Sequence, residues 1–113
     1  MLPLNNRLKK KKDFEEVFKN GKSYKENSLQ LKFLENNLKT SRFGFVVSKK
    51  FSKKAVVRNK IKRRLREIIR KNLIYIKKGF DCVIIVLPDL KIKKFEELEE
   101  ILIKLFKKAD LLE

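Results

Sequence analysis

The residues best suited to a recognisable chemistry form a dense cluster of cations in the middle of the chain. Residues 49–71 contain 12 lysine or arginine residues and a single acid, Glu67, within a chain of formal net charge +17. Four of these cations recur at every fourth position: Arg58, Lys62, Arg66 and Arg70. On a helix they repel one another along one face, so we expect an external polyanion to compensate them. Nucleic acid is the first candidate, ahead of an anionic membrane.

A helical arrangement of residues 55–76 separates these cations from the apolar residues. At about 100° per residue, one side carries Val57, Ile61, Leu65, Ile68 and Ile69. The adjacent side, called here the basic stripe, carries Arg58, Asn59, Lys62, Arg63, Arg66 and Arg70. A basic turn, residues 49–54, precedes the helix with Lys49, Lys50, Lys53 and Lys54. A helix N-terminus already attracts anions, so the segment predicts a phosphate-binding track. The alternative is a solvated helix face, although such faces usually mix both signs of charge.

Other chemistries lack the residues they require. The chain has no histidine and one cysteine, Cys82, which excludes Cys/His metal sites, Ser-His-Asp systems and internal disulfides. Cys82 lies in an apolar run and is expected to be a buried structural thiol. The dense carboxylates, Glu96, Glu97, Glu99 and Glu100, flank a helix start, where negative charges offset the positive end of the helix dipole. We therefore assign no catalytic and no metal-binding residue.

The chain is expected to remain in the cytoplasm. No apolar run approaches the roughly 20 residues of a membrane span. At the N-terminus the charges follow the few apolar residues, which is the opposite of the order in a signal peptide. A single cysteine also fits a reducing compartment.

The elements that position these residues follow from apolar spacing. We predict, in chain order, helix 12–20, strands 22–25, 29–34 and 42–48, helix 55–76, strand 80–88 and helix 93–111. Asp13 is expected to cap the first helix. Strands 29–34 and 42–48 alternate and are predicted to pair as an antiparallel hairpin. Strand 80–88 is a nearly continuous apolar run, as in a central strand covered on both faces.

This order predicts one α+β domain over residues 1–113, a two-layer α-β sandwich of about four strands and three helices, α-β-β-β-α-β-α. Residues 1–11 form a basic arm. The lysines of residues 9–12, beside Arg7, either bind the RNA or belong to a mobile solvated tail, and both descriptions hold if the arm becomes ordered on binding.

Two aromatic residues leave their role open. Phe14 and Phe18 are four residues apart on the first helix, a spacing that usually means core packing. Alternatively, exposed rings stack on unpaired bases without regard to base identity. Lys32, Gly44, Val46 and Ser48 alternate toward the sheet face opposite Phe33, Phe43 and Phe45.

Residues 55–67, AVVRNKIKRRLRE, resemble the signature of the bacterial ribonuclease P protein component, whose hallmark is Arg-Asn-Arg followed after two residues by Arg. Three further segments resemble that family, in the same order: RLKKKKDFEEVFKNGKS, RFGFVVSKK and GFDCVIIV. The resemblance extends from about Arg7 to Ala109. The hallmark triplet here is Arg58-Asn59-Lys60, and its lysine keeps the charge but loses the bidentate fork of arginine.

The resemblance implies a fold with a left-handed βαβ crossover and a role as the protein subunit of ribonuclease P, the ribonucleoprotein endoribonuclease that removes the 5′ leader of precursor tRNA. It implies that the RNA subunit carries the chemistry with Mg²⁺, while the protein, a monomer within the complex, binds that RNA and the single-stranded leader. The RNA-binding residues are then Arg58, Asn59, Lys60, Lys62, Arg63, Arg66, Arg70, Lys49, Lys50, Lys53 and Lys54. The leader cleft is then lined by Phe14, Phe18, Lys32, Val46 and Ser48.

Two other functions use the same basic surface. A structural, ribosomal-type RNA-binding protein needs the charge but not a single-strand cleft. A stand-alone nuclease needs an acid/base pair or a carboxylate metal cage near the cations. The second is disfavoured, because the basic segment contains no histidine and a single glutamate.

Overall fold

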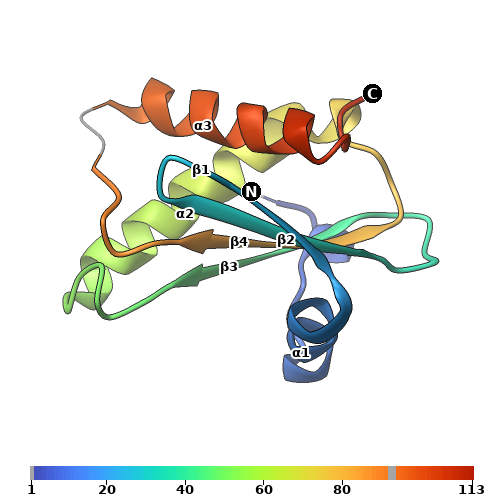
Figure 1. Ribbon diagram of the computed structural model, residues 1–113, viewed down its shortest axis with the longest axis horizontal. Helices are drawn as coiled ribbons and strands as arrows, with labels where there is room; N and C mark the ends of the chain where they lie inside the picture. The colour runs from blue at the N-terminus through green and yellow to red at the C-terminus, as the bar shows by residue number, and fades with distance from the viewer. Residues whose placement is uncertain (1, 92–93) are drawn as a thin grey trace.

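The chain folds into three α-helices and one four-stranded mixed sheet, as its computed structural model shows for residues 2–91 and 94–113 (Figure 1). The helices are α1 (Lys11–Asn20), α2 (Ala55–Asn72) and α3 (Phe95–Lys108). The strands are β1 (Lys22–Glu26), β2 (Leu29–Glu35), β3 (Arg42–Val47) and β4 (Phe80–Val86). Short 3₁₀ turns, η1 (Leu4–Asn6) and η2 (Leu73–Tyr75), precede α1 and follow α2. The predicted α+β class and element order are confirmed.

The strand order is β1-β2-β4-β3, so β4 separates β2 from β3. The hairpin predicted between strands 29–34 and 42–48 is therefore wrong. β2 forms its hairpin with β1 instead, through Asn27 and Ser28, which both have positive φ as a type I′ turn requires. β3 runs parallel to β4 and is connected to it through α2, which makes a βαβ unit. The left-handed crossover stays a prediction from the resemblance.

β4 takes the centre because it is apolar on both faces. Val83 and Ile84 point to opposite faces, and both are fully buried. This confirms the predicted central strand. Cys82, also on β4, is fully buried, and burial raises the pKa of its thiol, in agreement with the expected structural role.

Helices cover both faces of the sheet. α2 and α3 lie over one face, and α1 lies on the other side of the sheet (Figure 1). Phe33 and Phe43 enter the core beneath α2 and α3. Val17 of α1 and Val83 of β4 are the centre of a second, smaller apolar cluster on the other face. The predicted alternation of strands 29–34 and 42–48 is therefore confirmed, and α1 adds cover to the face opposite the main α-β layers.

Three details of the helices differ from expectation. Burial on α2 begins at Ile61, so Val57 in its first turn is 38% exposed and does not join the core. Asp13 does not cap α1, which begins at Lys11; the carboxylate accepts a hydrogen bond from Arg42 instead. α3 ends at Lys108 rather than residue 111, and the start predicted at residue 93 lies outside the described residues.

The N-terminal segment is held beside β3. The Leu8 backbone N–H donates to the Phe43 carbonyl over 2.9 Å, and Arg7 forms a parallel bridge with Phe43. Leu2 and Leu8 are buried, whereas the run Lys9–Lys12 is exposed. The apolar residues of this segment therefore anchor it at the sheet edge while its lysines face solvent.

Candidate nucleic-acid interface

α2 presents the basic stripe on the side that does not face the core. Asn59, Arg63, Arg66 and Arg70 are exposed, as is Lys60, while Arg58 and Lys62 are half-buried. Arg58 has a second role, because its Nη1 donates to the carbonyl of Ser52 over 2.8 Å. This bond ties the start of α2 to the basic turn and places the two groups of cations side by side.

Serine side chains order the basic turn. The Ser48 and Ser52 hydroxyls each accept a backbone N–H from two residues ahead, those of Lys50 and Lys54, both over 3.2 Å. All four lysines of the turn are exposed. Ser48, a candidate for the cleft, therefore contributes a turn contact that holds cations toward solvent at the start of α2.

The stripe is not uniform in charge along its length. Arg70 pairs with Glu67, with Nη2 and Oε1 separated by 2.6 Å. The hydrogen bond from Arg70 lowers the pKa of Glu67 and raises that of Arg70. Glu67 therefore offsets positive charge near the C-terminal end of α2, and the uncompensated field lies toward the basic turn.

Phe14 of α1 packs closely against the sheet at a glycine. A Cβ built on Gly44 of β3 would lie 2.3 Å from the Phe14 ring, so only glycine permits this approach. Phe14 and Val46 both pack against the smaller apolar cluster. Phe14 therefore takes the packing role that its spacing indicated, although it is only half-buried.

Phe18, one turn further along α1, is 42% exposed. Lys32 of β2 places its Nζ 5.3 Å from the centre of the Phe18 ring. An exposed aromatic face beside an ammonium group matches the two parts of a single-stranded nucleotide, a base and a phosphate. The structure thus brings together Phe14, Phe18, Lys32 and Val46 around α1, and places Ser48 between the end of β3 and the basic turn.

An ion network that sequence reasoning missed fixes α1 to the sheet. Arg42 of β3 makes a two-point contact with Asp81 of β4, with Nε–Oδ1 and Nη2–Oδ2 distances of 2.8 and 2.6 Å. The same guanidinium reaches Asp13 of α1 at 3.4 Å, and the hydrogen bond to Asp81 is the largest cause of its raised pKa. Asn36 donates to Asp81 over 2.8 Å. No linear spacing signals this network, because it depends on Arg42 and Asp81 being partners in the β3–β4 register.

The acidic residues of α3 serve the helix interface. Glu99 accepts hydrogen bonds from Asn72 and Lys71 of α2, both over 3.1 Å, and the bond from Asn72 is the main cause of its lowered pKa. Within residues 2–91 and 94–113 there is no group of three or more acidic or cysteine side chains placed to hold a metal ion. The same residues include no helix of the length and apolarity needed to cross a membrane.

Comparisons with known proteins point in one direction. The family model described as Ribonuclease P matches residues 2–110. The ribonuclease P protein component of Pseudanabaena sp. (strain PCC 6903) is 41% identical over 113 residues, covering 99% of this chain and 97% of the relative. The solved RNase P protein from Thermotoga maritima is 40% identical with a TM-score of 0.83, covering 90% of this chain and 96% of that one. The structure of the Staphylococcus aureus RNase P protein is 29% identical with a TM-score of 0.87, covering 96% and 98%.

The different environments of the two α1 phenylalanines predict different effects on stability. Phe14→Ala should lower the free energy of unfolding by about 3 kcal/mol, because it leaves a cavity against Gly44. Phe18→Ala should change it by less than about 1 kcal/mol, since a partly exposed ring and one cation–π contact are lost. Urea denaturation of both variants measures the difference. Equal destabilisation would contradict the division of roles.

Proposed function

The chain belongs to the ribonuclease P protein family, and we propose that it acts with a catalytic RNA to remove the 5′ leader of precursor tRNA. A subunit of this endoribonuclease needs an RNA-binding surface and gains from a site for the unpaired leader. The observation that carries the proposal is the presence of both surfaces on one small domain. Cations gather on α2 and the basic turn, and an exposed aromatic residue with a lysine lies at α1.

In this proposal the basic stripe and the basic turn contact the RNA subunit. The residues assigned are Arg58, Asn59, Lys60, Lys62, Arg63, Arg66, Arg70, Lys49, Lys50, Lys53 and Lys54. Support comes from the exposure of all of them except the half-buried Arg58 and Lys62, and from the Arg58–Ser52 contact, which aligns the turn with the helix. Lys60 is exposed in the hallmark triplet, where an ammonium is adequate for a phosphate contact.

The leader is assigned to the face beside α1. Phe18 supplies a ring for stacking, Lys32 a cation, and Phe14 and Val46 the apolar floor, with Ser48 at the adjoining turn. Stacking does not depend on which base is present. This suits a subunit that meets leaders of different sequence, and it separates the proposal from a purely structural RNA-binding protein.

The chemistry is assigned to the RNA and its Mg²⁺. The chain has no histidine, and its one thiol is buried. Glu99 of α3 accepts a hydrogen bond from Asn72 of α2 and is thereby engaged in the helix interface. Mg²⁺ supplies the activation of water and the stabilisation of the departing oxygen when the RNA holds it. The protein contributes binding and charge. We place the protein in the cytoplasm. We also assign it as a monomer within the complex, because copies of net charge +17 repel one another.

Reconstitution tests the proposal directly. The purified protein, the RNA subunit and a precursor tRNA are combined at low and high Mg²⁺, and the 5′ ends of the products are mapped. We expect the protein to lower the Mg²⁺ needed for leader removal, because its cations replace part of the ionic screening of the RNA. Leader removal by the protein without RNA would overturn the assignment of chemistry.

The basic stripe predicts a particular dependence of affinity on salt. Arg63→Ala should reduce the slope of log K against log[salt] for the RNA subunit by about 0.7–0.9, the value for one phosphate contact. Lys107→Ala is the control, because it removes the same charge from an exposed position on α3, and it should leave the slope unchanged. An unchanged slope in Arg63→Ala would move the RNA surface away from this side of α2.

The leader site predicts an effect confined to precursors that carry a leader. Phe18→Ala should weaken precursor tRNA binding in the complex by about 1–3 kcal/mol, the range for one stacked base, and leave mature tRNA binding unchanged. Tyr24→Ala is a matched control, because Tyr24 is also an exposed aromatic but lies on β1 and stacks on Phe33. An equal loss for mature tRNA would contradict the leader assignment.

A further inference from the structure

Helix α1 has few contacts that could hold its orientation on the sheet. It is ten residues long, and helices shorter than about 12–15 residues are marginal in isolation. Within the described part of the chain, its N-cap Lys10 makes no side-chain capping hydrogen bond, and Val17 alone of residues 11–20 is buried. A helix held by one buried side chain can roll about its own axis, so the contacts on either side of Val17 set its orientation.

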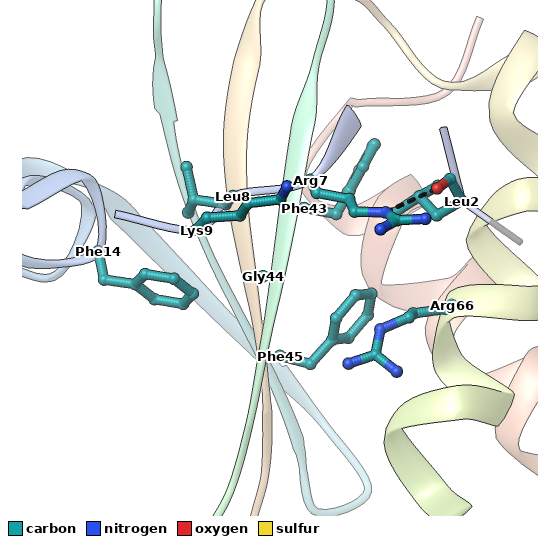
Figure 2. Close-up of a pocket in the computed structure, with 9 residues that line it drawn as sticks. All are labelled: Leu2, Arg7, Leu8, Lys9, Phe14, Phe43, Gly44, Phe45 and Arg66. Atoms are coloured by element: carbon teal, nitrogen blue, oxygen red, sulfur yellow. Dashed lines mark hydrogen bonds between the residues drawn. The ribbon is translucent and has the colours of Figure 1, made fainter. Parts of the chain in front are cut away.

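Two such contacts lie on opposite sides of Val17. At about 100° per residue, Asp13 lies about 40° to one side of Val17 and Phe14 about 60° to the other. The Phe14 ring points toward Gly44 of β3 and meets its backbone closely (Figure 2). Phe18 lies on the same side as Phe14 and further round the helix, so any roll of α1 displaces its ring.

Arg42 of β3 can hold Asp13 because its own position is fixed. Its Nε and Nη2 donate to the two carboxylate oxygens of Asp81 on β4, over 2.8 and 2.6 Å, and Asn36 donates to the same carboxylate. The remaining Nη1 lies 3.4 Å from Oδ2 of Asp13. Because the guanidinium is planar and rigid, its attachment to Asp81 determines where Asp13, and with it the first turn of α1, lies.

The proposed leader site depends on this orientation because it is divided between two elements. Phe18 belongs to α1 and Lys32 to β2, with 5.3 Å between the ring centre and Nζ. The C-terminal end of α1 is fixed independently, since a Cβ on Gly21 would lie 2.8 Å from the Phe33 carbonyl oxygen of β2. The Asp13 contact therefore controls the other end of the helix and its roll.

We propose that Arg42 is a positioning residue for the leader site. By binding Asp81 and Asp13 together, it fixes the orientation of α1 and hence the separation between the Phe18 ring and Lys32. Arg42 acts through Asp13 and α1, and its role needs no contact with RNA. The inference rests on the proposed function, because it assumes that Phe18 and Lys32 bind the leader.

Asp13→Asn is the test variant. A substitution of Arg42 would leave the largely buried Asp81 without its cation and destabilise the fold. Glu15→Gln is the matched control, because it removes the same charge from the same helix, where Glu15 is exposed and lies 3.9 Å from Lys11. Both variants change the net charge equally, so a difference between them reports the contact with the sheet.

Affinity is measured in the complex with the RNA subunit, for a precursor tRNA with leader and for mature tRNA. Asp13→Asn should weaken precursor binding about 3-fold to 10-fold, since α1 loses one of its two flanking contacts, and should leave mature tRNA binding unchanged. Glu15→Gln should change neither affinity. An equal loss for both tRNAs in Asp13→Asn would overturn the inference.

A double-mutant cycle separates positioning from a general loss of stability. If Asp13 acts through Phe18, adding Asp13→Asn to Phe18→Ala should cause no further loss of precursor affinity. Losses that add in the double variant would overturn the positioning role.

A fluorescence measurement on the free protein tests the orientation of α1 without RNA. The chain has no tryptophan, so Phe18→Trp introduces a single fluorophore. Its steady-state anisotropy should be lower when combined with Asp13→Asn than with Glu15→Gln, because the helix is held less firmly. Equal anisotropy in the two combinations would contradict the inference.

The outcomes distinguish this inference from the proposed function. If Phe18→Ala weakens precursor binding but Asp13→Asn behaves as Glu15→Gln does, the positioning role is refuted and the proposed function stands. If Phe18→Ala has no effect that depends on the leader, the leader site fails, and the inference fails with it.

Discussion

Strand β4 buries Cys82, Val83 and Ile84 completely, although these residues alternate between the two faces of the sheet. A strand of this kind must be covered on both sides, because apolar area left in water costs about 25 cal/mol per Å². α2 and α3 provide the cover on one face and α1 on the other (Figure 1). The two proposed binding regions, on α2 and beside α1, are therefore consequences of one buried strand.

The distribution of charge follows from the same arrangement. One flank of α2 meets α3, where Glu99 binds Lys71 and Asn72. Its basic stripe has Glu67 as the one acid among its cations, and this acid pairs with Arg70. Glu99 thus secures the contact between the helices, Glu67 offsets Arg70, and the remaining cations face outward toward the basic turn. Because charge is separated in this way, the cations repel one another in the free protein, and a bound polyanion relieves this repulsion.

The position of α1 depends on two contacts of different kinds. Gly44 lets the Phe14 ring approach the backbone of β3, and Arg42 links Asp13 of α1 to Asp81 of β4. Together they set how closely the helix lies on the sheet. Phe18 is left exposed one turn away. Packing and ion pairing therefore shape the surfaces that the proposed function uses.

The sequence by itself determined the class and order of the elements, the face of α2 that carries cations, and the alternation that buries Phe33 and Phe43. These features depend on the periodicity of neighbouring residues, which is local, and the family resemblance depends on the same short segments. The tertiary structure decided that β3 pairs with β4 rather than β2, which made the predicted hairpin wrong. It also decided the different roles of Phe14 and Phe18 and the Arg42–Asp81 pair. Each of these features depends on contacts between segments far apart in the chain. Such contacts form because the whole sheet must be buried, and the local spacing of residues does not predict them.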